Sequence, residues 1–294
     1  MPTETTLSSR LMPVPEAGRV LVFDSGMGGL TVAREIMARA PRVAVDYAAD
    51  TGFFPYGDKS DAALRARLPE IAAQLVERAK PDVFVIACNT ASTLALEEVR
   101  AQLDIPVVGT VPAIKPAVAS TKTGVIGLLA TPGTIRRDYT ARLIDDFAQG
   151  VSVIMHGSIE LVRLAEAHAA GEAHDAAGFG AAVQPIFEAD GGDRVDTIVL
   201  ACTHFPLVRE QLVAASPRPV QFIDSGAAIA RQTLRVLSRE TEGRAPNDRP
   251  GGRVFLTSSL SQNRRLLSVC RTFGFPSAHD LMAEENAENR SASI

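Results

Sequence analysis

The chain has 294 residues, of which 46% are apolar and 22% are charged, with a formal net charge of -4 and a pI near 5.8. This composition excludes a disordered chain, a coiled coil and a collagen-like protein, and the length is typical of two domains. The sequence has no Lys/Arg block, which argues against nucleic acid as a partner, and its apolar runs fall far short of the ~18 residues of a membrane span.

Short β-rich runs alternate with segments of helical periodicity along the chain, and this alternation predicts parallel sheets covered by helices. The predicted strands are residues 19–23, 43–49, 83–87, 106–110, 123–130, 151–155, 197–201, 220–223 and 254–257. The predicted helices are residues 29–39, 60–79, 91–102, 134–147, 158–169, 175–189, 206–214, 226–238 and 260–272. The polar ends, residues 1–17 and 283–294, are expected to fray.

Three cysteines, Cys88, Cys202 and Cys270, are too few and too widely spaced for a disulfide framework or for paired zinc ligands. The N-terminal segment MPTETTLSSRLMPVPEAG has no apolar stretch of the kind found in secretory signals. We therefore expect a cytoplasmic protein with reduced thiols.

Two segments of the chain resemble each other and predict an internal duplication. VFVIACNTAS carries Cys88 at the end of an apolar strand, and TIVLACTHFP carries Cys202 in the same setting. Pro106 follows the first cysteine by 18 residues, and Pro219 follows the second by 17. This repeat predicts two similar parallel-sheet α/β domains related by pseudo-twofold symmetry, with the active site in the cleft between them. The first domain, residues 1–115 and 226–294, would carry Cys88, and the second, residues 116–225, would carry Cys202.

The ends of these two strands are where an open α/β sheet binds its ligands. Cys88 and Cys202 each precede a predicted helix, whose N-terminus can lower the pKa of a thiol from the ~8.5 of a free side chain. A lone cysteine after an apolar strand is more often a packing residue, and that interpretation is adopted for Cys270. The glycine-rich loop DSGMGG (24–29) offers backbone N–H groups to a carboxylate or phosphate but lacks the spacing of a dinucleotide motif.

His204 lies two residues after Cys202, and we interpret it and Asp24 as acid–base partners of the two thiols. A zinc site made of Cys88, Cys202 and His204 is an alternative, but it lacks the local ligand pairs of such sites, so no metal is expected.

Seven motifs follow one another between residues 22 and 230: VFDSGMGGLTVAREI, ADTGFFPYGDKS, VIACNTAS, VVGTVPAIKPAV, GVIGLLATPGT, VLACTHFP and FIDSGAAIA. Together they resemble the glutamate racemase family, within the cofactor-independent aspartate/glutamate racemase superfamily. The resemblance implies that Cys88 and Cys202 are the paired acid and base, acting on the D- and L-enantiomer respectively, and that no cofactor is used. It also implies that Asp24 and His204 assist the two cysteines. The implied glutamate-binding residues are Asp24, Ser25, Pro55, Tyr56, Gly57, Asn89, Thr90, Thr131, Thr203 and His204.

The sequence departs from the family pattern at Gly52, Phe53 and Phe54, and at HGSIELVRLAEA (156–167), which lies where part of the second-domain cleft wall is expected. Proton transfer on both faces of the α-carbon predicts sulfur atoms roughly 7 Å apart. The resemblance further implies D-glutamate supply for peptidoglycan synthesis and a possible homodimer. The alternatives are a racemase of aspartate or another small acidic amino acid, a Cys–His thiol hydrolase or amidase, and a non-catalytic solute-binding module.

Overall fold

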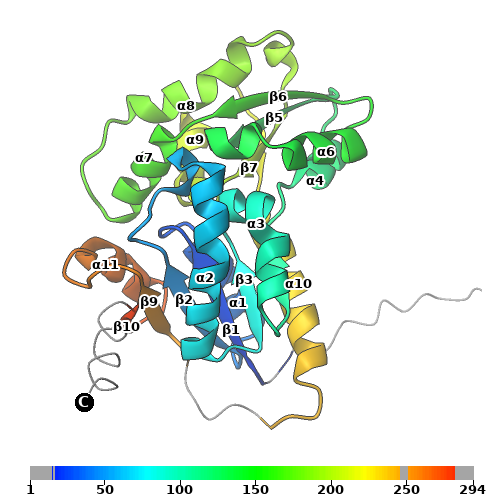
Figure 1. The fold of residues 1–294 in the computed structure, drawn as a ribbon. Helices are drawn as coiled ribbons and strands as arrows, with labels where there is room; N and C mark the ends of the chain where they lie inside the picture. Colours follow the sequence, from blue (N-terminus) through cyan, green and yellow to red (C-terminus); the bar gives the residue numbers. More distant parts are fainter. Residues whose placement is uncertain (1–14, 16, 246–250, 282–294) are drawn as a thin grey trace, which may run out of the picture.

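The computed structural model describes residues 15, 17–245 and 251–281, which form two parallel sheets covered by helices (Figure 1). The chain ends that were expected to fray therefore lie outside the described residues, apart from residues 15 and 17. In the described part of the chain, no helix is both long enough and apolar enough to cross a membrane.

The larger sheet has six strands in the order β10-β9-β2-β1-β3-β4, all parallel. Its strands are β1 Arg19–Asp24, β2 Ala44–Ala49, β3 Val83–Ile86, β4 Val107–Gly109, β9 Arg253–Leu256 and β10 Ser277–Asp280. Its helices are α1 Leu30–Arg39, the 3-10 turn η1 Tyr56–Asp58, α2 Asp61–Ala79, α3 Asn89–Gln102, α10 Gly226–Glu240 and α11 Arg264–Thr272. One apolar core lies between this sheet and α1, α10 and α11, and a second lies between the sheet and α2 and α3. The sheet is therefore buried on both faces, as its continuous apolar strands predict.

The smaller sheet has four parallel strands in the order β6-β5-β7-β8. Its strands are β5 Val125–Ala130, β6 Ser152–Gly157, β7 Thr197–Ala201 and β8 Gln221–Ile223. Its helices are α4 Ile114–Ser120, α5 Pro132–Ile135, α6 Asp138–Phe147, α7 Glu160–Ala169, α8 Ala177–Glu188, η2 Gly192–Arg194, η3 Phe205–Val208 and α9 Arg209–Ala215. Helices α7 to α9 cover one face, and α4 and α6 cover the other.

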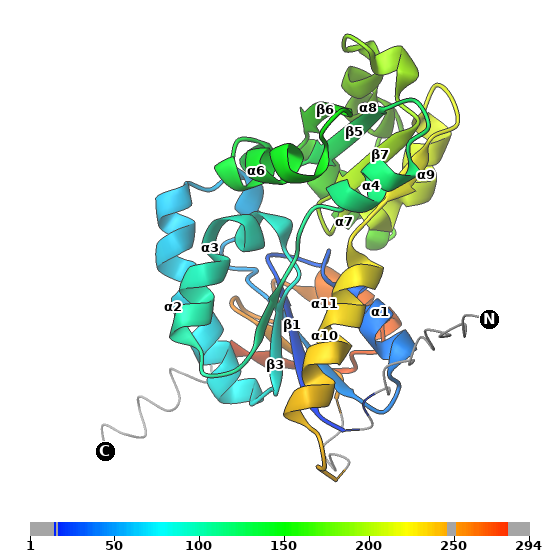
Figure 2. The same cartoon turned by 90° about the vertical axis from the view of Figure 1, so that its right-hand side faces the viewer.

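The strand orders of the two halves correspond. β2-β1-β3-β4 in the larger sheet matches β6-β5-β7-β8 in the smaller one, so β3 and β7 occupy equivalent positions. This match confirms the predicted fold class of two similar parallel-sheet α/β units. The chain passes between the halves twice, after β4 and before α10, and Figure 2 shows the two crossing segments side by side. They are joined where the Ser225 hydroxyl donates to the Val111 carbonyl. Domain boundaries at residues 115 and 225 stay a prediction.

Several elements differ from the sequence-based expectation. The single helix predicted at 134–147 is two helices, α5 and α6, because Arg137 has extended backbone angles (φ -87°, ψ 140°). The helix expected at 206–214 starts with the 3-10 turn η3. Helix α4 was not predicted because Pro116 lies inside it, although a proline is tolerated in the first turn. Strand β10 was not predicted because it is a short and largely polar edge strand.

Candidate active site

Cys88 lies just beyond the carboxyl end of β3, where the buried strand gives way to α3. It occupies the N-cap position of that helix and is 6% exposed. The following residues turn the chain at this point: the Ser92 hydroxyl donates to the Ile86 carbonyl at 3.0 Å and accepts from the Thr110 backbone N–H at 2.9 Å. The start of α3 is thereby held against the ends of β3 and β4, which gives Cys88 a defined position.

Cys202 lies at the equivalent place in the other half, just after β7, and is also 6% exposed. Thr203 and His204 follow it, and the 3-10 turn η3 begins directly after His204. Since β3 and β7 are equivalent strands, the fold brings the two thiols to corresponding positions in the cleft.

A single small cavity between the two halves is lined by both thiols. Its walls include every binding or catalytic residue expected from the sequence except Asp24. The lining residues are Ser25, Pro55, Tyr56, Gly57, Cys88, Asn89, Thr90, Thr131, Ile159, Val162, Cys202, Thr203 and His204. The free volume is about 10 Å³, room for about one water molecule. The two halves are therefore closed on one another too tightly for an amino acid to enter without their separating.

Asp24 lies beneath this cavity and links the halves. Its carboxylate accepts hydrogen bonds from the Thr203 hydroxyl at 2.7 Å, from the Gly26 N–H at 3.1 Å and from the Ser25 hydroxyl at 3.4 Å. Burial raises the pKa of Asp24, while the nearby His204 and these hydrogen bonds oppose the rise. The Cys88 thiol in turn donates to the Ser25 hydroxyl at 4.0 Å, so Asp24 acts on that thiol through Ser25.

His204 connects the second thiol to a carboxylate that the sequence analysis did not identify. Its Nδ1 lies 3.8 Å from the Cys202 Sγ, and its Nε2 lies 2.9 Å from Oε1 of Glu166 on α7. The same Glu166 oxygen accepts the Met27 N–H at 3.0 Å. Cys202, His204 and Glu166 therefore form a connected chain of polar groups that leads out of the cavity.

The electrostatic environments of the two thiols differ. Burial and the Asp24 carboxylate raise the pKa of the Cys88 thiol, against the Ala91 backbone N–H that favours the thiolate. The expectation that the helix N-terminus lowers this pKa is therefore wrong for Cys88, because desolvation outweighs the helix. For His204, burial disfavours the charge, but the hydrogen bonds and charges of Cys202 and Glu166 raise its pKa well above the ordinary value. The two sides of the cavity thus differ: the pKa of the Cys88 thiol itself is raised on one side, and the pKa of the imidazole beside Cys202 is raised on the other.

The glycine-rich loop 24–29 binds a carboxylate, as the sequence predicts, but in this structure the carboxylate is the side chain of Glu166. The N–H of Met27 binds Glu166, and the carbonyl of Gly26 accepts from the buried Tyr47 hydroxyl at 2.6 Å. A Cβ on Gly28 would lie 2.6 Å from His204 Nδ1. Glycine at this position is required because the loop packs directly against the histidine.

The loop that carries Tyr56 is fixed by a buried carboxylate. Asp50 is fully buried and accepts from the Tyr56 hydroxyl at 2.6 Å, from two Arg67 nitrogens at 2.6 Å and from the Thr257 hydroxyl at 2.5 Å. A forked arginine–carboxylate pair is directional, so this network holds the aromatic ring and the adjacent Gly57 at the cavity.

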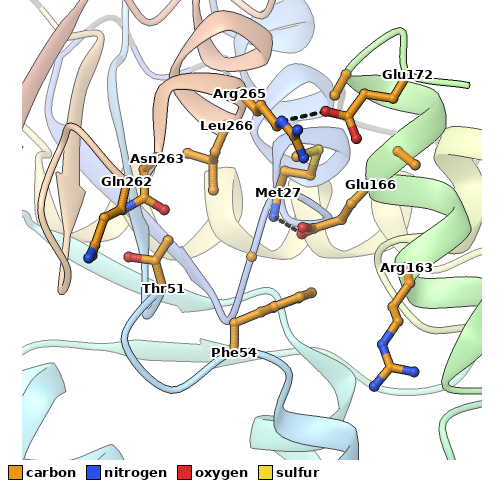
Figure 3. A pocket seen from close by; sticks show the side chains of 13 residues that line it. Met27, Thr51, Phe54, Arg163, Glu166, Glu172, Gln262, Asn263, Arg265 and Leu266 are labelled. Carbon is orange, nitrogen blue, oxygen red and sulfur yellow. Dashed lines mark hydrogen bonds and ion pairs between the residues drawn. The ribbon is translucent and has the colours of Figure 1, made fainter.

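A second cavity of about 300 Å³ lies behind Glu166, on the surface side of the polar chain (Figure 3). It is walled by Phe54 and Met27, and an ion pair between Arg265 of α11 and Glu172 crosses it from one half to the other. Glu166 thus has its inner side on His204 and its outer side toward this cavity.

The functional residue missed from the sequence is Glu166, in the segment 156–167 that departs from the family pattern. Ile159 and Val162 of this segment also line the cavity that holds the two thiols. The signal that was available is the helical spacing of Ile159, Val162 and Glu166, which places one acidic side chain on the same face as two apolar ones. Cys270, in contrast, is fully buried in the core beneath α11, which confirms its interpretation as a packing residue; burial raises its pKa to about 12.

Comparisons with known proteins relate most of the chain to one family. A model of the family described as Asp/Glu/Hydantoin racemase matches residues 31–233. A glutamate racemase of Sphingopyxis alaskensis is 48% identical over 233 residues, which are 79% of this chain and 85% of that protein. A glutamate racemase of Klebsiella pneumoniae is 43% identical over 262 residues, which are 89% of this chain and 91% of that protein.

Solved structures show the same relationship. The structure of Escherichia coli glutamate racemase in complex with L-glutamate and the activator UDP-MurNAc-ala is similar to this one with a TM-score of 0.82 at 41% identity, covering 90% of this chain and 98% of that one. Glutamate racemase isoform RacE1 from Bacillus anthracis gives a TM-score of 0.76 at 28% identity, with the same coverage of both chains.

Proposed function

This chain belongs to the Asp/Glu/hydantoin racemase family of isomerases, and from that premise we propose that it interconverts L- and D-glutamate without a cofactor. The observation that carries the proposal is the placement of Cys88 and Cys202 at equivalent strand ends, both lining one buried cavity. Relatives of 48% and 43% identity named glutamate racemase, and a similar structure that contains L-glutamate, support glutamate as the substrate.

The proposed reaction removes the proton from one face of the α-carbon and delivers a proton to the opposite face. One thiolate removes the α-proton, and the opposite thiol delivers a proton to the other face, so that each product leaves the enzyme ready for the reverse reaction. A thiolate is far less basic than the carbanion that forms, so oriented donors and the exclusion of water must stabilise the negative charge of that carbanion. Backbone N–H groups and hydroxyls of the lining residues are suited to that task, and the closed cavity excludes bulk solvent.

The surroundings of the two thiols favour one assignment. Cys88, whose pKa is raised, rests as the thiol and gives a proton to one face of the α-carbon. The His204 imidazole, whose Nδ1 lies 3.8 Å from the Cys202 sulfur, is placed to exchange a proton with that thiol, so that Cys202 accepts the α-proton of L-glutamate. This assignment agrees with the resemblance, in which Cys202 acts on the L-enantiomer.

A buried acceptor in the cavity suits the substrate ammonium. Oδ1 of Asn89, in the part of the chain that the structure describes, is buried and has no hydrogen-bond partner. An amide oxygen left in this way costs free energy unless a ligand supplies the donor. The α-ammonium of an amino acid provides N–H donors, and the hydroxyls of Thr90 and Thr131, which line the cavity, are placed to donate to its carboxylates.

A second candidate function is favoured by the Cys202–His204–Glu166 chain, whose order of nucleophile, base and orienting carboxylate also suits a thiol hydrolase or amidase. That function would not need Cys88. Racemisation of aspartate is a further alternative within the family and would be shown by a higher turnover of aspartate than of glutamate.

The test is solvent deuterium incorporation at the α-carbon by the purified protein with no added cofactor. We expect the wild-type chain and Cys270→Ser to racemise glutamate in both directions, and Cys88→Ser and Cys202→Ser each to lose nearly all turnover. Full activity of Cys88→Ser on an amide or ester, with acyl-enzyme formation, would favour the hydrolase. A folded wild-type sample saturated with glutamate that exchanges no α-proton would refute both racemisation and the two-thiol mechanism.

By the same family relationship, we propose that the D-glutamate formed serves peptidoglycan synthesis in the cytoplasm. The reduced thiols that the mechanism requires are consistent with that compartment. A homodimer remains a prediction, which light scattering coupled to size exclusion would measure.

A further inference from the structure

A set of polar contacts joins the two halves on the side of the cleft formed by α3, α5 and α6. Arg137, at the N-cap of α6 in the half that carries Cys202, reaches across to the half that carries Cys88. One terminal nitrogen donates to the Thr90 carbonyl at 2.5 Å and to the Thr93 hydroxyl at 3.0 Å. The other donates to the Asp61 carboxylate at 3.0 Å. A single arginine side chain, 7% exposed, thus binds both α2 and α3 of the opposite half.

A cluster of threonine hydroxyls continues this contact into the catalytic cavity. Thr90 lies 3.0 Å from Thr131 and 3.4 Å from Thr134, and Thr131 lies 3.1 Å from Thr134, measured between hydroxyl oxygens. Thr90 and Thr131 come from opposite halves, and both line the cavity. The arginine and the threonines therefore form one buried seam that reaches the site.

The seam acts on the part of α3 that positions Cys88. Helix α3 is kinked at Ala95 (φ -132°, ψ 19°), which separates the first segment, residues 89–94, from the rest of the helix. Cys88 is the N-cap of that segment, and Arg137 binds a carbonyl and a hydroxyl within it. These two hydrogen bonds tie the segment to the other half.

The guanidinium of Arg137 is buried with incomplete hydrogen bonding, which offsets part of what its contacts contribute to stability and favours a geometric role. In the described part of the chain its Nε is buried with no hydrogen-bond partner. Burying an arginine requires it to lose its hydration, and this cost offsets much of the gain from an ion pair that it forms. Its partner Asp61 has a side chain that is 59% exposed and would stay hydrated without it. Loss of the guanidinium would leave no uncompensated buried charge.

We propose that Arg137 is a positioning residue, which re-forms its contacts with α3 each time the halves close and so sets the position of Cys88 relative to Cys202. The inference rests on the proposed racemisation. Because the closed cavity holds about one water molecule, the halves separate for each substrate molecule and then close again. If a smaller fraction of the molecules has the two halves closed, the apparent affinity for glutamate falls in proportion to that fraction.

The kinetic test compares Arg137→Met with Arg136→Met, an exposed neighbour that serves as the matched control. We expect Arg137→Met to raise KM by about tenfold for both enantiomers, with a smaller fall in kcat and an unchanged melting temperature. The equilibrium constant of a racemisation is one, so kcat/KM must fall equally in both directions. Arg137→Lys should recover part of the loss, because an ammonium can bind the Thr90 carbonyl but cannot form the fork to Asp61.

A second measurement does not depend on catalysis. Amide hydrogen exchange, followed by mass spectrometry without glutamate, should be faster in residues 89–94 of Arg137→Met and unchanged in β3 and β7. If the wild-type chain does not racemise glutamate, the kinetic comparison reports the failure of the proposed function, and the exchange data still decide on Arg137. If Arg137→Met does not fold, Arg137→Lys and Thr93→Val carry the same two measurements.

Unchanged KM together with unchanged exchange in residues 89–94 would overturn the proposal. A lowered melting temperature with a loss of kcat/KM that Arg137→Lys does not recover would also overturn it, since Arg137 would then serve the stability of the fold.

Discussion

Replacing Glu166 by glutamine tests the polar chain that leads from Cys202 out of the cavity. The amide keeps the size of the side chain and an oxygen to accept the Met27 N–H, but it removes the negative charge 2.9 Å from His204 Nε2. A hydrogen bond to a charged group contributes about 1.5–3 kcal/mol. Since Glu166 is 22% exposed, solvent screens part of this, and the lower end of the range applies. A loss of about 1.5 kcal/mol corresponds to about a tenfold fall in kcat/KM.

The pH dependence of Glu166→Gln should change in a defined direction. The charge of Glu166 helps to raise the pKa of His204, so its removal lowers that pKa. If the charged imidazole stabilises the Cys202 thiolate, activity falls as the pH rises through the pKa of His204. The alkaline limb of the kcat/KM profile should therefore move to lower pH in the variant.

Isotope effects locate the defect on one of the two thiols. In Glu166→Gln, transfer between Cys202 and L-glutamate should become the slower step, so the isotope effect on kcat/KM should rise with α-deuterated L-glutamate and fall with α-deuterated D-glutamate. Glu172→Gln is the matched control, because this residue lines the same outer cavity but pairs with Arg265 instead of His204. The reasoning is refuted if the isotope effects change in the opposite sense or if the control behaves like the variant.

Two further substitutions test residues beside the two cavity thiols, and a third tests the packing role of Cys270. Gly28→Ala places a methyl group 2.6 Å from His204 Nδ1, so it should displace the histidine and lower kcat/KM about 100-fold. Gly180→Ala is the control, because the space around Gly180 is open, and it should leave kcat/KM unchanged. Asp24→Asn should lower kcat/KM at least about tenfold. Burial raises the pKa of Asp24, so its ionisation opposes folding once the pH rises above the unfolded value near 3.8, and the melting temperature of the variant should gain on that of the wild type from there upward. A difference in melting temperature that does not grow as the pH rises from 3.8 would contradict this. Cys270→Ala should lower the free energy of unfolding by about 1 kcal/mol and leave kcat/KM unchanged, as chemical denaturation and the racemase assay would show.

The positions of the two thiols could be predicted because their signal is local. An apolar run that ends in Ala-Cys and is followed by polar residues indicates a buried strand with its last side chain at the ligand-binding edge of the sheet. The repeat of this pattern at Cys88 and Cys202 then predicts equivalent positions, and the observed strand orders agree. Local patterns of this kind depend on neighbouring residues, which one sequence contains in full.

The roles inferred for Glu166 and Arg137 have no such signal. Glu166 meets Met27 across 139 positions of sequence, and Arg137 meets Thr90 across 47. Helical periodicity indicates which face of a helix is buried, but not which surface of the other half it meets. The pKa of Cys88 was mispredicted for a related reason: the helix N-terminus can be read from the sequence, whereas the burial that outweighs it depends on how the two halves pack.

The two thiols lie at the ends of equivalent strands, but the side chains that contact them differ. Cys88 contacts Ser25, and through it Asp24, whereas Cys202 contacts His204, and through it Glu166. Asp24 is fully buried, while Glu166 borders an open cavity. Burial and the Asp24 carboxylate raise the pKa of the Cys88 thiol, whereas Cys202 lies beside an imidazole whose own pKa is raised. Because the free energies of L- and D-glutamate are equal, this asymmetry cannot change the equilibrium. In the proposed racemisation, the asymmetry sets which of the two proton transfers is slower, which is the quantity that paired isotope effects measure.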